Sequence, residues 1–418
     1  MYQMDETISN VDDRDEVFLL RAAELVVAGG LSSLSLRSLA DAAGVSPSLV
    51  TYRYGARDKL VQRMFEAARA RDAAFWDRSR QSVARLDLSP GDLPAAMSAL
   101  CLSAVSVASR DLVLRWACAS EAMRTPDLLE VSRGWSAQDV EFWRTLLRQA
   151  GVTPTLAPAL SACMEWVIRV GLTARDNDLL TRIWMSDLVS RLAARLFGKA
   201  DVAADDSAAR LQIKALAVAQ TSGPAMDGAR TQTPKRIIEA AARLAAQNGP
   251  GGLTHRAIAK EAGVSLSSMT HHFSSLGEIQ QLAFARLYED ARKSSVPDLP
   301  ARMEINEFTS GILPVLFQRA NVQGHGAIAM DEIILAASRT IQTEAVGSGL
   351  MALVGQTSTV MLKAMAGDVK VDRIDGQIFR FVMTGLNELS ASQPDSERTP
   401  WFADNCALFL RHYLSVES

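Results

Sequence analysis

The chain has 418 residues, a length that exceeds one hydrophobic core and predicts two or more domains. Its 48% apolar and 22% charged residues are ordinary for a soluble globular protein, and no apolar run approaches the roughly 18 residues that cross a bilayer. The formal net charge of −3 argues against a uniformly basic nucleic-acid-binding surface.

The first predicted helix ends at Gly29 and Gly30, two residues that stop helices. Its apolar stripe has the spacing i, i+4 and i+7 and consists of Phe18, Ala22 and Leu25. A second helix is predicted over 36–43, a third over about 47–53 and a fourth from near Arg57.

The turn between the second and third helices has the residues of a helix-turn-helix. Gly44 stands where the chain must leave one helix sharply, a position that favours a positive φ. Ser46 is predicted to cap the third helix by accepting a backbone N–H bond from two or three residues further on. Ala40 is small enough for the two helices to cross closely.

Longer helices follow, and prolines separate several of them. They are predicted over 93–109, 111–122, 127–149, 156–174 and 179–197. Residues 198–230 are rich in Ala, Asp, Ser and Gly and include one short predicted helix over 206–219, so we interpret them as a tether.

The same order of elements recurs 219 positions later. The 18 residues that begin at Arg37 align without a gap with the 18 that begin at Arg256, and eight pairs are identical. The apolar stripe recurs as Ile237, Ala241 and Leu244. Helices are predicted over 255–262 and 266–272, with the turn at Gly263 and the cap at Ser265 between them, and a further helix begins near Leu276. Two matches at a fixed offset predict two copies of a DNA-reading unit.

After the second copy, helices are predicted over 304–320, 328–345, 347–366, 373–388 and 399–414. Strand signals are weak throughout, so the expected class is all-α. Positive charge gathers on the repeated units: residues 14–63 carry seven basic and five acidic side chains, and residues 230–279 carry six and three. The rest of the chain is therefore net acidic, and the basic excess lies where phosphates would be met.

These residues resemble the DNA-binding domain of TetR/AcrR-type transcriptional regulators, over about 50 residues in each half. The family pattern is a Gly-Val-Ser turn, a short recognition helix, an aromatic residue and a step into a long fourth helix. The resemblance implies an all-α fold of two tandem TetR-like units that form a pseudo-dimer, each with a three-helix DNA-binding domain and a helical ligand-binding and dimerisation domain. The implied DNA-binding domains are 1–62 and 230–281, the helical domains 63–200 and 282–418, and the linker 201–229.

The resemblance also places DNA contacts on the recognition helices and their flanks. In the first half these are Arg37, Ser46, Pro47, Ser48, Thr51, Tyr52, Arg53 and Arg57. In the second half they are Lys235, Arg256, Ser265, Ser267, Ser268, Thr270, His271 and His272. Tyr54 and Phe273 take the aromatic position of the family and are expected in the core.

The two halves depart from each other at their phosphate anchors. Arg57 stands where the family usually has a phosphate-binding lysine, whereas the second half has Leu276 there and basic residues at its first helix, Arg230, Lys235 and Arg236. Because the recognition helices also differ, we hypothesise an operator with two different half-sites. The two implied DNA-binding domains, 1–62 and 230–281, are called the first and second heads below. The alternative is a regulator that acts through protein interactions, in which one or both heads no longer read DNA.

The family function implies a repressor released by a small apolar or amphipathic ligand. Aromatic and soft side chains of the first helical domain either line its pocket or form core: Trp116, Met123, Trp135, Phe142, Trp143, Met164 and Trp166. Arg115, Glu121, Glu165 and Arg169 are either polar ligand contacts or surface charges.

The expected partners are a double-stranded DNA operator and a small-molecule effector. Segments 156–197 and 373–414 are expected to associate within one chain, which leaves further dimerisation open. The expected location is the bacterial cytoplasm, at the nucleoid, because residues 1–14 are polar and acidic and do not form a signal peptide.

No enzyme activity, cofactor, metal or membrane association is expected. The sequence has no Gly-rich phosphate loop and no catalytic motif, and the adjacent His271 and His272 would face different sides of a helix. The four cysteines, Cys101, Cys118, Cys163 and Cys406, lack metal-ligand spacing and are expected to be buried free thiols.

Overall fold

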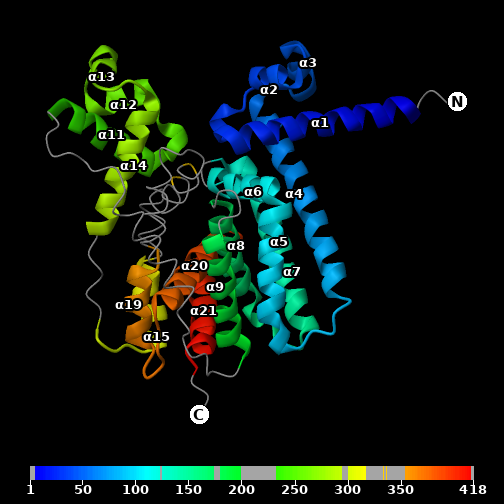
Figure 1. Cartoon of the computed structure of the whole chain (residues 1–418), viewed down its shortest axis with the longest axis vertical. Coiled ribbons are helices and arrows are strands. Elements are labelled where there is room, and N and C mark those ends of the chain that lie inside the picture. Colours follow the sequence, from blue (N-terminus) through cyan, green and yellow to red (C-terminus); the bar gives the residue numbers. More distant parts are fainter. Residues whose placement is uncertain are drawn as a thin grey trace. The chain divides into compact units, whose positions relative to one another are not determined.

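The structure is a computed structural model that describes residues 5–122, 125–173, 179–198, 232–293, 300–316, 333, 336 and 354–415. Every regular element in these residues is helical and none is a strand, which confirms the all-α class (Figure 1). The chain divides into two compact units. One comprises Met1–Leu86 and Ser103–Phe142, and the other comprises Asp87–Leu102 and Trp143–Ser418.

The helices of the first half follow the predicted order. They are α1 Asp5–Gly29, α2 Leu36–Ala43, α3 Pro47–Tyr54, α4 Arg57–Val83, α5 Leu93–Val107, α6 Ser109–Ala122, α7 Leu129–Gln149, α8 Ala157–Thr173 and α9 Leu179–Phe197. Three of them are entered through short 3₁₀ turns that begin with proline, η2 Pro90–Asp92, η3 Pro126–Leu128 and η4 Pro154–Leu156. The fixed φ of proline suits the first turn of a helix, so the prolines mark helix starts.

The described helices of the second half are α11 Gln232–Asn248, α12 His255–Ala262, α13 Leu266–His272, α14 Leu276–Lys293, α15 Ile305–Glu307, α19 Gln356–Met365, α20 Arg373–Ser390 and α21 Asp395–Tyr413. A π-helical turn, Phe308–Ile312, follows α15. α21 begins before the predicted start at 399, because Pro394 takes the N-cap position and Asp395 and Glu397 favour the first turn. The predicted helix over 206–219, and nearly all of that over 328–345, lie outside the described residues.

Each predicted DNA-binding head is built on the apolar stripe of its first helix. In the first head, Phe18 and Ala22 of α1 are buried in one core with Val50 and Tyr54 of α3. In the second head, Ile237 and Ala241 of α11 are buried with Met269 of α13 and with Phe273. The recognition helices are thereby fixed by one apolar side, as the helical spacing predicted.

Within the second unit, α8 packs along α20, and α9 and α21 contact both helices. The Trp166 and Phe381 rings stack with centroids 5.8 Å apart, and Arg169 donates to both carboxylate oxygens of Glu388 at 2.9 and 2.8 Å. The two backbones approach closely at Gly385, where an added Cβ would lie 2.6 Å from the Cβ of Ala162. The segments 156–197 and 373–414 thus lie in contact with each other.

Two described segments are long and apolar enough to cross a membrane by length and composition, so the expectation of no such run is wrong. Pro154–Thr173 is 83% buried within the protein, as is usual for the core helix of a bundle. Pro90–Val107 is 33% buried. Its exposed face is formed mainly by small residues such as Ala95, Ala99 and Ser103, which would offer lipid little apolar surface.

The four cysteines are buried thiols outside any disulfide, as expected. Burial raises the pKa of Cys118 to about 12 and also raises the pKa values of Cys163 and Cys406. The thiolate is the reactive form, so these side chains behave as inert apolar groups near neutral pH.

Candidate DNA-binding surface

The two helix-turn-helix turns have nearly the same backbone geometry. Gly44 has φ 66° and ψ 32°, and Gly263 has φ 63° and ψ 40°, both in the left-handed region. The N–H of the following valine donates at 3.0 Å to the carbonyl of Ala40 in the first head and of Ala259 in the second. The positive φ expected at both glycines is confirmed.

The caps of the recognition helices differ from each other. The Ser265 hydroxyl accepts the Ser268 N–H at 3.1 Å and caps α13, as predicted. The corresponding prediction for Ser46 is wrong: its hydroxyl makes no cap hydrogen bond and lies 3.0 Å from the Ser48 hydroxyl. The Leu49 N–H donates instead to the Ser46 carbonyl at 3.1 Å, so the first turn of α3 closes through the backbone.

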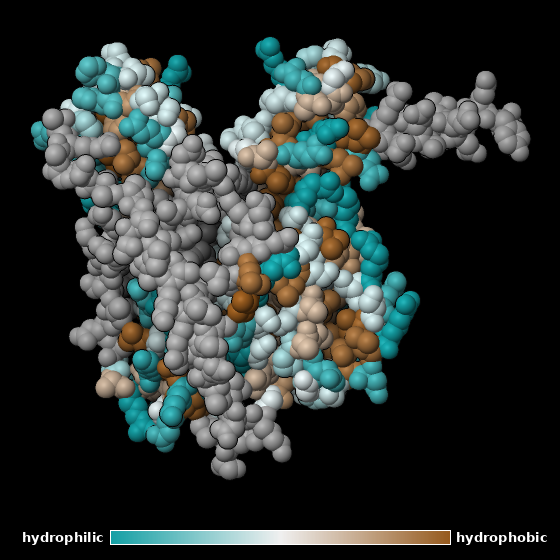
Figure 2. Space-filling model, in the orientation of Figure 1, coloured by the Kyte–Doolittle hydropathy of each residue, from teal (hydrophilic) through white to brown (hydrophobic). Residues whose placement is uncertain are grey.

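Most of the predicted DNA contacts lie on the solvent-facing side of the heads. The exposed ones are Arg37, Ser46, Pro47, Ser48, Thr51, Tyr52 and Arg57 in the first head and Lys235, Arg256, Ser265, Ser267, Thr270, His271 and His272 in the second. Tyr52 is 90% exposed, an unusual position for an aromatic side chain that has no partner to recognise. The surface over α12 and α13 is mainly hydrophilic (Figure 2).

Arg53, one of the expected DNA contacts, is held in place by the protein itself, and its contact with DNA stays a prediction. Its Nε donates to Asp15 of α1 at 2.6 Å, and the Tyr54 hydroxyl and Arg63 donate to the same carboxylate at 2.6 and 2.9 Å. Partial burial by itself would raise the pKa of Asp15. The hydrogen bonds from Tyr54 and Arg53 outweigh this effect, so the pKa of Asp15 lies below its ordinary value. The acidic residue of the first helix therefore orients α3 on α1.

Arg57 has a similar internal role in addition to its exposed position. Its Nε donates to the Leu34 carbonyl at 2.7 Å and its terminal nitrogen to the Leu31 carbonyl at 2.8 Å. The N-cap of α4, Ala56, provides no side-chain hydrogen bond. The start of α4 therefore has no side-chain cap, and the Arg57 charge beside it favours an anion, although Asp58 of the same turn lies 3.8 Å from Arg57.

The start of α14 in the second head is closed by its own side chains. The Glu278 N–H donates to the Ser275 hydroxyl at 3.2 Å, and the Glu278 carboxylate accepts the Ser274 N–H at 3.0 Å. Leu276 packs against the core of the head. Arg236 of α11 donates to the Ala262 carbonyl at 2.6 Å, and Lys235 beside it is exposed. The two heads therefore present different groups to a phosphate backbone.

A buried charge cluster lies among α4, α6 and α7 of the first unit. Arg115 is 6% exposed and lies 3.1 Å from a carboxylate oxygen of Asp139 and 4.0 Å from one of Asp72. Asp72 also accepts a hydrogen bond from the Trp135 indole at 2.5 Å. Asp72 continues the buried helical series of Phe65 and Ala68 on α4, and this spacing indicates that its side chain is buried.

The predicted pocket residues are all buried where they are described, namely Trp116, Trp135, Phe142, Trp143, Met164 and Trp166, and Met123 lies outside the described residues. Trp166 stacks on Phe381 in the helical bundle, which is a core role. Arg169, a candidate ligand contact, uses its guanidinium on Glu165 and Glu388. The assignment of the other aromatic residues to a pocket stays a prediction.

These turns, with exposed recognition helices set on buried stripes, define a helix-turn-helix DNA-binding protein. The family model described as bacterial regulatory proteins, tetR family, matches residues 237–279, and the model described as a tetracyclin repressor-like C-terminal domain matches residues 88–199. Comparison with curated proteins gives no match. The chain therefore contains domains of the TetR family, and these domains support a DNA-binding transcriptional regulator.

Proposed function

We propose that the chain is a sequence-specific repressor that works as an intramolecular pseudo-dimer, with two DNA-binding heads on one polypeptide. The observation that carries the proposal is a repeat with a single offset that runs from the heads into the helical bundle. Arg37 and Arg256 open the two helix-turn-helix copies 219 positions apart. Arg169 and Glu388, which form an ion pair, have the same separation.

The order of the family matches supports two fused units. The match to the C-terminal domain, 88–199, precedes the match to the DNA-binding domain, 237–279, although a single subunit has the reverse order. The helix-turn-helix of α2 and α3 precedes the first of these matches. The chain thus reads as head, helical domain and head, with further helices after them.

The bundle contacts also occur in equivalent pairs. The offset of 219 relates Trp166 to Gly385 and Ala162 to Phe381. Trp166 contacts Phe381, and Ala162 contacts Gly385, so exchanging the halves converts one contact into the other. An approximate two-fold axis produces such pairs, and a two-fold axis is the symmetry of ordinary dimers.

The proposed operator has two different half-sites about one helical turn, roughly 34–36 Å, apart. Thr51 and Tyr52 of the first head correspond to Thr270 and His271 of the second, so the side chains offered to the bases differ. The phosphate anchors differ too, because the start of α4 is uncapped and that of α14 is closed by Glu278. A pair of identical heads would read a palindrome, and these heads need not.

Release from DNA is proposed to follow the binding of a small apolar or amphipathic effector in the first helical domain. The tetracyclin repressor-like match over 88–199 supports this location, as does the buried Arg115 between Asp72 and Asp139 beside Trp135. A ligand acts only through its differential affinity for the DNA-bound and released states. The proposed place of action is the bacterial cytoplasm, at the nucleoid.

The test is binding of the full chain to the DNA upstream of its own gene, measured against salt and against unrelated DNA. We expect a steep salt dependence with sequence preference. Tyr52→Ala and His271→Ala should each weaken specific binding by about 1–3 kcal/mol, which is roughly 5- to 150-fold. Arg78→Ala is the matched control, because Arg78 is exposed on α4 well beyond the head.

Footprinting of the same variants tests the asymmetric operator. Tyr52→Ala should release protection in one half-site and His271→Ala in the other. Equal effects of each substitution on both half-sites would contradict the asymmetric reading. Undiminished binding by both variants, with a flat salt dependence, would instead favour the protein-interaction regulator.

A further inference from the structure

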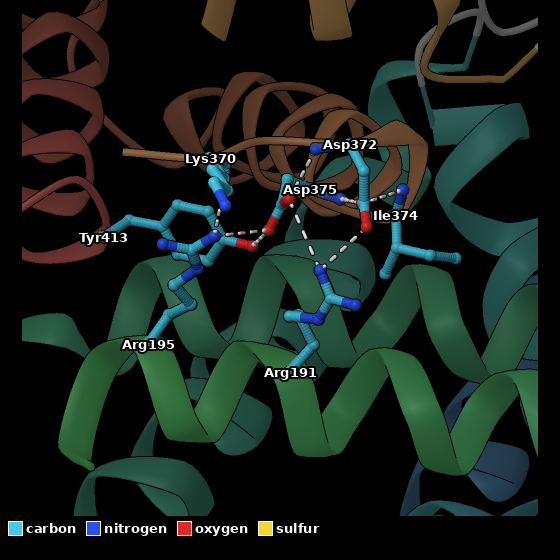
Figure 3. A network of polar contacts seen from close by, with 7 residues as sticks. All are labelled: Arg191, Arg195, Lys370, Asp372, Ile374, Asp375 and Tyr413. Atoms are coloured by element: carbon cyan, nitrogen blue, oxygen red, sulfur yellow. Dashed lines mark hydrogen bonds and ion pairs between the residues drawn. The ribbon is translucent and has the colours of Figure 1, made fainter. Parts of the chain in front are cut away.

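The bundle of α8, α9, α20 and α21 carries a buried polar network where α9 meets α20 (Figure 3). Arg191 of α9 lies 3.0 Å from a carboxylate oxygen of Asp372 and 3.5 Å from one of Asp375. Arg195, one turn further on, lies 3.6 Å from Asp375, whose carboxylate also accepts the Tyr413 hydroxyl at 2.7 Å. Asp375 is fully buried and the Arg191 side chain is 4% exposed.

The equivalent place on the other side of the bundle is apolar. There α21 packs against the turn η4, Pro154–Leu156, and against α8. The offset of 219 places Leu156 where the network has Asp375, and Leu410 and Leu414 where it has Arg191 and Arg195. All three leucines are buried. The network therefore has no counterpart, and the two sides of the bundle differ in chemistry.

A second polar contact shows the same one-sidedness. The Trp184 indole of α9 donates to the Gln377 side-chain oxygen of α20 at 2.9 Å, and both residues are buried. The equivalent positions hold Ala403 and Pro158, which have no side-chain polar groups. In these contacts the first half supplies the N–H donors, Trp184 and Arg191, and the second half supplies the oxygen acceptors.

The contact between equivalent positions is also of opposite charge. Arg169 and Glu388 occupy the same place in the two halves and face each other. Two copies of the first half would set Arg169 against Arg169 and bury Arg191 against Leu156. Two copies of the second half would set Glu388 against Glu388 and leave Asp375 without a basic partner from α9. A buried charge without a partner is strongly unfavourable.

We propose that this interface is heterotypic: α8 and α9 accept α20 and α21 as their partner and reject a second copy of themselves. The inference rests on the proposed pseudo-dimer and adds to it the kind of partner that each surface fits. The partner of a first half is always a second half, within the chain or from a second chain. Attraction in one pairing and repulsion in the other two provide the specificity.

The experiment starts from the full chain with a specific protease site inserted between residues 200 and 230. The purified protein is cleaved, unfolded in urea, refolded by dilution and examined by native mass spectrometry, in which the two halves have different masses. We expect heterotypic complexes in at least about tenfold excess over either homotypic complex. Indiscriminate pairing would give heterotypic complexes as only about half of the total and would overturn the inference.

The outcomes separate this inference from the function on which it rests. Halves that stay apart as monomers would contradict the pseudo-dimer itself, whereas halves that pair indiscriminately would contradict only the heterotypic interface. Operator binding by the uncleaved chain is measured separately and does not depend on the pairing result.

A second test needs no refolding of separated halves. In the intact chain, Arg169→Glu and Glu388→Arg should each lower the melting temperature, because each sets like charges together. The double variant should recover only part of the loss, because an acidic side chain at position 169 also faces Glu165. Arg85→Glu is the matched control, since it makes the same charge change at an exposed position outside the bundle. A double variant that loses as much as the two single variants combined would count against the inference.

Discussion

The first head depends on one carboxylate, Asp15, which ties α1 to α3 and α4. It accepts bonds from Arg53 and Tyr54 at 2.6 Å each and from Arg63 at 2.9 Å. Asp15→Asn removes the charge and keeps the shape. A hydrogen bond to a charged group contributes about 1.5–3 kcal/mol, and the asparagine oxygen can still accept one bond. The Arg63 side chain is 59% exposed, so its pair adds little.

We therefore expect Asp15→Asn to lower the opening free energy of the first head by about 2–4 kcal/mol. Hydrogen exchange of peptides from α1 to α4 measures this quantity in the whole chain. Tyr54→Phe removes only one donor to this carboxylate and should lower the same free energy by about 1.5–3 kcal/mol. Equal protection of the Asp15→Asn variant and the unmodified protein at pH 7 would refute the reasoning, as would a larger loss for Tyr54→Phe.

The same carboxylate gives a pH dependence of known sign. Partial burial opposes the shift, but the bonds from Tyr54 and Arg53 lower the pKa of Asp15 below its ordinary value of 3.8. A carboxyl group with a lowered pKa contributes its full stability above the unfolded-state value and loses it as pH falls through the folded value. The difference between Asp15→Asn and the unmodified protein should therefore shrink below about pH 4. A difference that persists unchanged in acid would contradict this role of Asp15.

Three further predictions concern packing and backbone. Gly44→Ala should lower the free energy of unfolding by about 1–2 kcal/mol, because residue 44 has a left-handed φ. Gly251→Ala should leave thermal unfolding nearly unchanged, because a Cβ at residue 251 meets no atom within 4 Å. Gly385→Ala should lower the free energy of unfolding in urea by about 1–3 kcal/mol, because the new Cβ would lie 2.6 Å from the Cβ of Ala162. An unchanged urea midpoint would count against that close approach. Trp184→Phe leaves the buried Gln377 oxygen without its donor and should cost about 1–3 kcal/mol, part of which the double variant with Gln377→Leu should recover.

The elements of the heads could be predicted from the sequence because their signals are local. α2 and α12 occupy the predicted 36–43 and 255–262, since a glycine ends each helix in the left-handed region and a hydroxyl caps each start. A cap or a stop acts within one turn of the chain, so neighbouring residues determine it. The Ser46 cap is missing for an equally local reason, because the Leu49 N–H donates to the Ser46 carbonyl instead.

The roles of charged residues could not be predicted in the same way, because their partners are distant in sequence. Arg53 pairs with Asp15, Arg57 donates to the Leu31 carbonyl, and Arg169 pairs with a residue of the other half. From the sequence, each arginine is equally compatible with DNA, ligand or solvent. Only the packing of helices decides which acid or carbonyl comes within reach.

A symmetric homodimer has the same residue at both ends of any contact on its two-fold axis, so such a contact cannot join opposite charges. Positions 169 and 388 correspond by the offset of the helix-turn-helix repeat, and they hold Arg and Glu. Two halves of one chain can change independently, which allows an ion pair at that place and a polar network on one side of the bundle. The same independence allows Tyr52 in one recognition helix and His271 in the other. In the proposed pseudo-dimer, the asymmetry of the bundle and that of the heads have one physical origin, and we expect a base change in one operator half to affect only one head.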